Sequence, residues 1–225
     1  LVIWTSCMVS CGDADGAVTG NTRKYATSLE KINKVIDARS GEIMFGLNMV
    51  VNKGKTVFIG DTSVHENPTA NQLTEIAISS ARVVRLFGFD PKVAFVSHST
   101  FGQPATDSTK HVRDAVEILQ DKKVDFQFDG EMQPDVALNE EYKSLYSFSG
   151  IVGNANILIM PGQHSAAISY KMMKSLGGAK VIGPLLIGLG QPIEIAPLRS
   201  STSDILNLAC IAAYSAGVIN YGKKN

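Results

Sequence analysis

Residues 91–128 read PKVAFVSHSTFGQPATDSTKHVRDAVEILQDKKVDFQF, and this stretch decides the fold. It opens with a short apolar strand at 93–96, followed by a polar loop that runs to Asp107. Apolar side chains then recur at helical spacing, and residues 124–128 predict the next strand. Strand, helix and strand in this order indicate a parallel sheet covered by helices, in which ligands bind at the carboxyl ends of the strands.

The chain before this stretch predicts a hairpin and three helices. Residues 43–51 and 55–59 are β-rich runs separated by Asn-Lys-Gly, which is typical of a hairpin. A long helix opens at Asn67-Pro68 and closes at Gly88. Residues 27–37 predict a shorter amphipathic helix, and an apolar helix is expected to end at Gly12. Because the sequence starts without methionine inside that apolar segment, we expect it to be N-terminally incomplete.

The chain after this stretch continues the alternation. Strands are expected at 156–160 and 181–189, with a helix between them at 166–176. An apolar helix from residue 202 to about residue 221 closes the chain. The sequence therefore predicts an α/β fold of mostly parallel sheets with flanking helices.

Composition excludes several classes of function. Lys and Arg together number 21, as do Asp and Glu, so the net charge gives no electrostatic reason to expect nucleic acid or an anionic membrane as partner. The apolar opening at residues 1–9 is too short to span a bilayer, and no basic segment precedes it as in a signal peptide. Cys7, Cys11 and Cys210 lack paired spacing, which predicts reduced, mostly buried thiols in a cytoplasmic protein and no zinc site.

A series of short motifs resembles the phosphate acetyltransferase and butyryltransferase family, in order and spacing, over essentially the whole chain. The motifs are DGAVTG at 15–20, NPT at 67–69, PKVA at 91–94, SHST at 97–100, DGEMQ at 129–133, ANILIMP at 155–161, YK at 170–171, GP at 183–184, GL at 188–189 and SDILN at 203–207. The resemblance implies the two-lobe, isocitrate/isopropylmalate dehydrogenase-like architecture of phosphotransacetylases. Residues 1–40 with 186–225 would form an incomplete first lobe, and residues 41–185 the second.

The residues of three motifs indicate one branch of that family. GDAD at 12–15, Phe101-Gly102 after Ser99, and GEM at 130–132 resemble the version fused behind the catalytic domains of multidomain NADP-dependent malic enzymes. This implies that malate oxidation, NADP and a divalent metal belong to upstream domains, and that this region binds acetyl-CoA as an allosteric effector and self-associates. No cofactor or metal is expected within the chain itself.

Acetyl transfer between phosphate and CoA needs a base for the thiol and cationic donors for the phosphoryl oxygens. The resemblance places the family's base at Asp204. The serine and arginine that active transferases carry just before it correspond to Pro197 and Leu198, and a second family arginine corresponds to Glu30. Proline and leucine side chains donate no hydrogen bond, and a carboxylate repels a phosphate dianion. The resemblance therefore implies a regulatory domain without transferase activity.

The alternative is an active phosphate acetyl- or butyryltransferase that uses Asp204 as base and Arg199 as anion clamp. Arg199 and Arg23 lie close enough in the sequence to replace the missing arginines. A third possibility is a region that serves only as an oligomerisation scaffold.

Binding of CoA requires an apolar slot, a few polar anchors and donors for the pyrophosphate. We expect the loop from 97 to 109 and the helix after it to supply some of these. The residues expected to face acetyl-CoA are Ser99, Thr100, Lys110, Arg199 and Asp204. Two simpler interpretations remain open: that Asp204 only favours the dipole of the last helix, and that the loop hydroxyls only cap turns.

Overall fold

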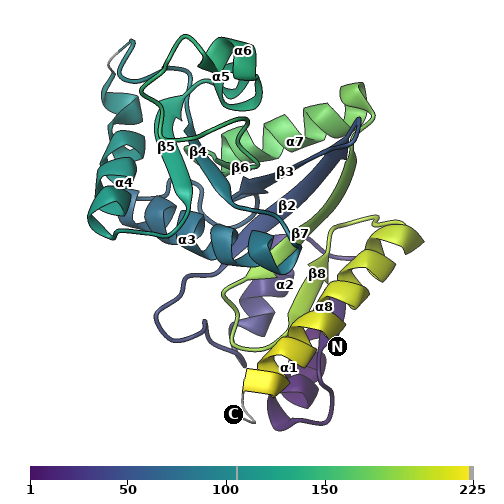
Figure 1. Cartoon of the computed structure of the whole chain (residues 1–225). Helices are drawn as coiled ribbons and strands as arrows, with labels where there is room; N and C mark the ends of the chain where they lie inside the picture. The colour runs from purple at the N-terminus through teal and green to yellow at the C-terminus, as the bar shows by residue number, and fades with distance from the viewer. Residues whose placement is uncertain (105, 223–225) are drawn as a thin grey trace. The chain divides into compact units, whose positions relative to one another are not determined.

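The computed structural model describes residues 1–104 and 106–222. The chain divides into two compact units, unit 1 with Leu1–Gly46 and Ile182–Asn225, and unit 2 with Leu47–Val181. It passes from one unit to the other within two strands, β2 (Phe45–Asn52) and β7 (Lys180–Ile187) (Figure 1). The positions expected for these boundaries from the sequence were 40/41 and 185/186.

The strands of unit 2 lie in the order β5-β4-β6-β3-β2 and form a mostly parallel sheet. Their bounds are β3 (Lys55–Gly60), β4 (Lys92–Val96), β5 (Gln127–Met132) and β6 (Ile157–Ile159). β4 pairs in parallel with β5 and β6, and β6 pairs in parallel with β3. β2 and β3 form the predicted antiparallel hairpin, in which Lys53 and Gly54 take positive φ angles of 48° and 77° that suit a two-residue turn.

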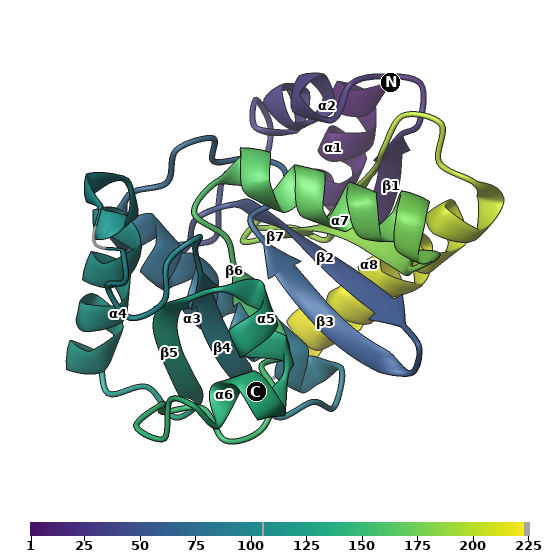
Figure 2. The ribbon, with the colours of Figure 1, turned by 90° about the horizontal axis from the view of Figure 1, so that it is seen from above.

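Helices cover both faces of this sheet. They are α3 (Ala70–Leu86), α4 (Lys110–Asp121), α5 (Pro134–Leu138), α6 (Glu140–Lys143) and α7 (Gln163–Gly177). Figure 2 shows α3 and α4 on one side and α5 and α7 on the other. Ala94 and Val96 of β4 pack in one core cluster with Val136 of α5 and Ala166 of α7. Because side chains alternate along a strand, Val93 and Phe95 point to the opposite face. The α/β fold with flanking helices is confirmed.

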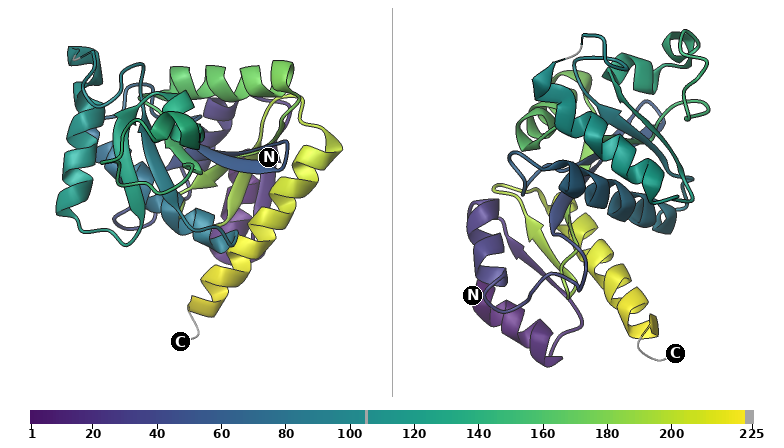
Figure 3. Two further views of the ribbon diagram at one scale, coloured as in Figure 1. Left: turned by 45° about the horizontal axis from the view of Figure 1, so that its top comes forward. Right: turned by 90° about the vertical axis from the view of Figure 1, so that its left-hand side faces the viewer.

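Unit 1 is built on a pair of short parallel strands, β1 (Ala17–Gly20) and β8 (Ile193–Ala196). Figure 3 (right) shows α1 (Val2–Cys11) and α2 (Tyr25–Ile32) on one side of the pair and α8 (Thr202–Gly222) on the other. Gly20 has a φ of 106°, and a Cβ atom there would collide with the carbonyl oxygen of Ala196. Only glycine therefore allows the two strands to end side by side.

Some expectations about elements were wrong. β1 and β8 were not predicted. The helix expected over 27–37 ends at Ile32, and the buried Ile36, whose apolar spacing suggested a longer helix, lies beyond it. β5 lies at Gln127–Met132 instead of 124–128. Its Gly130 lies against Phe95, whose carbonyl oxygen would be 2.7 Å from an added Cβ atom. Hydrophobic alternation alone does not reveal such a close approach.

The cysteines were expected to be mostly buried, and this was wrong. All three are free thiols, but Cys7 is only half-buried and Cys11 and Cys210 are exposed. α1 and α8 are apolar around most of their circumference, so their apolar composition did not distinguish buried from exposed positions.

Candidate functional site

The carboxyl end of β4 in unit 2 leads into the hydroxyl-rich loop. Ser99 is fully buried, and its Oγ donates to Glu131 Oε1 at 2.8 Å and lies 3.4 Å from Ser97 Oγ. Glu131 is itself 1% exposed and comes from β5, the neighbouring parallel strand. The Ser99 hydroxyl therefore serves a buried carboxylate and holds the loop in place.

The residues after Ser99 form a tight turn. Thr100 and Gln103 exchange backbone hydrogen bonds of 3.1 and 3.0 Å, and Phe101 and Gly102 between them have φ angles of 48° and 80°. Glu131 holds the turn twice: its Oε1 accepts from the Gly102 N–H at 2.9 Å, and its carbonyl oxygen accepts from the Phe101 N–H at 2.8 Å. Our sequence reasoning missed Glu131. The signal was the acidic residue in DGEMQ, on the strand after the loop.

Two cations in the first turn of α4, Lys110 and Arg113, have different environments. Lys110 is the first residue of α4 and is exposed. The Arg113 guanidinium donates to Thr109 Oγ1 and to the Thr106 carbonyl oxygen, and its Nη1 lies 3.6 Å from Glu131 Oε1. Arg113 thus ties the loop to Glu131, whereas Lys110 faces solvent.

The carboxyl ends of β1 and β8 in unit 1 border a hollow of about 370 Å³. Asn21, Arg23, Ala196 and Ile205 are among its lining residues. Arg199 is exposed on the loop between β8 and α8, and its N–H donates to the Asn21 carbonyl oxygen at 3.1 Å. Two arginines of unit 1 therefore stand on loops at this end of the strand pair.

Asp204 lies in the first turn of α8 and is half-buried. Its Oδ2 accepts from the Ser201 N–H at 2.9 Å and from Ser201 Oγ at 2.8 Å, and its own N–H donates to Ser201 Oγ at 3.2 Å. This reciprocal pattern is a capping box. The carboxylate that the sequence predicts at the family's base position thus serves the N-terminus of a helix.

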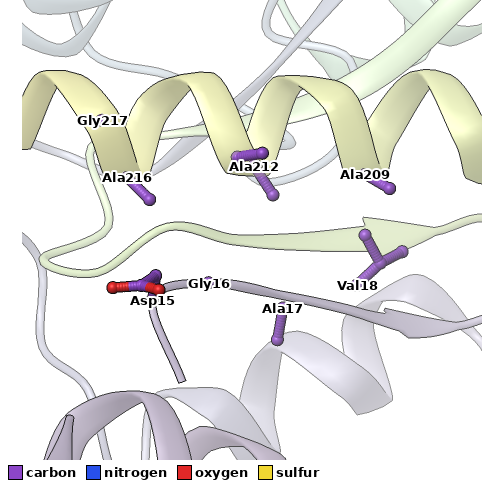
Figure 4. Close-up of a pocket in the computed structure, with 9 residues that line it drawn as sticks. Asp15, Gly16, Ala17, Val18, Ala209, Ala212, Ala216 and Gly217 are labelled. Atoms are coloured by element: carbon purple, nitrogen blue, oxygen red, sulfur yellow. The ribbon is translucent and has the colours of Figure 1, made fainter. Parts of the chain in front are cut away.

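Figure 4 shows a second hollow of unit 1, of about 560 Å³. Ala209, Ala212 and Ala216 of α8 face the segment from Asp15 to Val18. Among the described residues that line it, Asp15 alone is charged. The described lining of this hollow therefore offers no cation to a phosphate.

Glu194 is a titratable group of unit 1 that the sequence reasoning missed. It lies in β8, two residues before Ala196, and is buried. Burial raises the pKa of Glu194 to about 8, although the Leu186 N–H, which donates to Glu194 Oε2 at 2.9 Å, opposes this shift. A mainly neutral carboxylic acid therefore supports the strand beside the hollow at neutral pH.

The part of the chain that the structure describes holds no group of three or more His, Cys, Asp or Glu side chains placed to bind a metal ion. None of the described helices combines the length and the apolar character that crossing a membrane requires.

Comparisons with known proteins agree with the sequence motifs. The NADP-dependent malic enzyme of Rhizobium meliloti is 47% identical over 93% of this chain, and the chain spans 28% of that enzyme's length. The phosphate acetyltransferase of Bacillus subtilis is 31% identical over 93% of the chain, which spans 65% of that protein. The crystal structure of a phosphotransacetylase from Streptococcus pyogenes superposes with a TM-score of 0.89 at 32% identity, covering 95% of this chain and 66% of that one. The model of the family described as "Phosphate acetyl/butaryl transferase" matches residues 2–213, so the chain belongs to this family, in the phosphotransacetylase-like form that malic enzymes also carry.

Proposed function

We propose that this chain is the phosphotransacetylase-like regulatory and oligomerisation domain of an NADP-dependent malic enzyme. It binds acetyl-CoA as an allosteric effector and does not transfer acetyl groups. The observation that carries the proposal is the environment of Asp204. Its Oδ2 takes both Ser201 donors, and the residues at the positions of the family's serine and arginine are Pro197 and Leu198, which donate no side-chain hydrogen bond.

The charge distribution supports the same proposal. Glu30, at the position of the second family arginine, is exposed, and its Oε1 lies 3.4 Å from the Nζ of Lys34, which follows the end of α2. A solvated glutamate gives a phosphate dianion no binding partner. An acyl-CoA ligand requires less, because an apolar slot with a few anchors holds most of its area. The hollow at the ends of β1 and β8 offers space of this kind, which supports the proposal.

The residues proposed to face acetyl-CoA divide by environment. Lys110 and Arg199 are exposed cations suited to phosphate oxygens, and Thr100 and Asp204 are proposed as polar anchors. Ser99 has its hydroxyl bonded to Glu131, so we assign it the role of holding the loop.

The proposal extends to the whole protein. Other domains of the parent enzyme would carry out the oxidative decarboxylation of malate to pyruvate, with NADP and a divalent metal, in the cytoplasm. This chain would self-associate and adjust that activity. The share of the malic enzyme that the chain spans, 28%, leaves ample length for such domains.

Calorimetric titration of the full-length protein with acetyl-CoA tests the effector role. We expect saturable binding that weakens in Lys110→Ala and is unchanged in Lys55→Ala, an exposed lysine at the amino end of β3. Malate-site ligands should change the acetyl-CoA affinity by the same factor by which acetyl-CoA changes theirs, because coupling is reciprocal. Absence of binding at millimolar acetyl-CoA would refute the proposal.

One observation favours the alternative, an active phosphate acetyl- or butyryltransferase. Arg23 lines the hollow, and the Arg199 backbone is bonded to Asn21 in the same lining. Arg199 would then clamp the phosphoryl group while Asp204 acts as base. Transfer activity separates the two functions.

A further inference from the structure

A hollow of about 260 Å³ in unit 2 lies beside the turn that follows Ser99. Its lining combines polar side chains with two aromatic rings. The polar groups are the Thr100 hydroxyl, the Gln103 and Gln133 amides and the Asp135 carboxylate, and the rings are those of Tyr142 and Tyr146.

The turn holds one part of this lining in place. Phe101 has a left-handed backbone, which is unfavourable for a bulky residue and occurs mainly where the surroundings enforce it. Here the two Glu131 hydrogen bonds enforce it, and the Phe101 ring lies 5.3 Å from that of Tyr146 and 4.8 Å from that of Phe148. The Gln133 N–H donates to Thr100 Oγ1 at 3.1 Å and ties β5 to the same turn. The Thr100 hydroxyl and the Tyr146 ring are therefore preorganised.

The short helix α6 holds the other ring. Asn139 Oδ1 caps its first turn by accepting from the Glu141 N–H at 3.0 Å, and Lys143 at its end is buried. Tyr142 between them is 46% exposed. A ring fixed at its base with an open face is suited to stacking.

The charges of the lining select the ligand. Asp135 is the one charged side chain among the described residues that line the hollow, so a phosphate group would be repelled there. A planar, neutral ring with an amino group suits the tyrosine rings, the amides and the carboxylate of this lining. Aromatic faces stack on it, amides pair with its donors and acceptors, and a carboxylate accepts from the amino group.

We propose that this hollow binds an aminopurine ring. The identification of that ring as the adenine of acetyl-CoA rests on the proposed function above. The thioester and pyrophosphate would then be bound elsewhere, because the described part of the lining holds no cation for them.

Two ligands test the proposal on the full-length protein by calorimetry: acetyl-CoA, and acetyl-S-pantetheine, which lacks the adenine nucleotide. Tyr142→Ala should weaken acetyl-CoA binding about tenfold, as expected for loss of a stacked base, and leave acetyl-S-pantetheine binding unchanged. Tyr214→Ala, at a tyrosine of α8 that is 54% exposed, is the matched control and should change neither. Equal weakening of both ligands by Tyr142→Ala, or no effect on acetyl-CoA, would overturn the proposal.

A second readout keeps this inference separate from the effector role. In saturation-transfer NMR, millimolar adenosine should bind the wild type and lose signal with both Tyr142→Ala and Asp135→Asn. If acetyl-CoA does not bind but adenosine shows this pattern, the effector role fails and the purine site stands. If the wild type shows no transfer to adenosine, the purine site is refuted, even where acetyl-CoA binds.

Discussion

Two helices of this molecule begin with the same device, one in each unit. At α3, Thr69 Oγ1 accepts from the Gln72 N–H at 3.3 Å, and Gln72 Oε1 accepts from the Thr69 N–H at 2.9 Å. At α8, Ser201 and Asp204 repeat the pattern with 3.2 and 2.9 Å. The two boxes differ in the side chain at the third residue of the helix. Gln72 of α3 is a neutral amide, whereas Asp204 of α8 is a carboxylate.

The difference teaches that a capping box does not by itself identify a catalytic carboxylate. In α3 the box leads into a core, because Leu73 in the next position is fully buried. In α8 the next position is Ile205, which is half-buried and lines a hollow. The residue after the α8 carboxylate thus lines a hollow, whereas the hydrogen bonds of the carboxylate itself are those of a cap.

The largest expected change in stability concerns the residue that follows each box, Leu73 in α3 and Ile205 in α8. Leu73→Ala should lower the free energy of unfolding by about 2–5 kcal/mol, because it leaves a cavity in a closed core. Ile205→Ala should cost clearly less, since its surroundings are already open. Urea unfolding of the two variants measures this, and equal losses would show that the hollow of unit 1 is closed in solution.

The next largest effect is the pH dependence of stability that Glu194 of unit 1 causes. Because burial raises the folded-state pKa of Glu194 to about 8, the folded state binds more protons than the unfolded state between about pH 4.5 and 8. Stability should therefore fall as pH rises through this window, by an amount on the order of a few kcal/mol. Glu194→Gln should flatten the dependence, whereas Leu73→Ala should only shift it. An unchanged slope in Glu194→Gln would contradict the assignment.

Removal of each box should have a smaller and similar cost. Thr69→Ala and Ser201→Ala should each lower the free energy of unfolding by about 1 kcal/mol, because each exposes helix N–H groups without a side-chain acceptor. Thermal denaturation followed by circular dichroism is sufficient to compare them. A negligible cost at Ser201 alone would mean that the α8 box is not formed in solution.

The smallest expected change in stability comes from removing the charge from the α8 box and adding one to the α3 box. Asp204→Asn should lose, and Gln72→Glu should gain, about 0.3–1 kcal/mol at low ionic strength, because a negative charge favours a helix N-terminus. Both differences should shrink in high salt. Should Asp204→Asn stabilise the protein instead, the carboxylate would be held at a stability cost, as functional groups often are.

The sequence predicted those elements of the α/β fold in which apolar periodicity extends over many residues. It failed for elements whose position depends on contacts with segments distant in the sequence. The strand–loop–helix unit from β4 to α4 and the long helix α3 follow directly from their patterns. β1 and β8 are only four residues each, too short for a period to show. β5 was misplaced because its Gly130 and Glu131 are explained by contacts with Phe95 and Gly102, which belong to other segments.

The candidate site was predictable to a similar extent. The family motifs led to the loop after β4 and to the start of α8. They did not reveal that the Ser99 hydroxyl is bonded to Glu131, or that Asp204 bonds to Ser201, because both depend on side-chain orientation. The ring pair Tyr142 and Tyr146 lies in a stretch without regular periodicity, and only the fold brings it to Thr100.

The most direct test of the central claim is the rate of acetyl-CoA formation from acetyl phosphate and CoA by the purified protein. We predict no rate above that of the reaction without protein, in both the wild type and Asp204→Asn. A protein-dependent rate that Asp204→Asn abolishes would show a working base where we describe a helix cap, and would make the chain an acyltransferase.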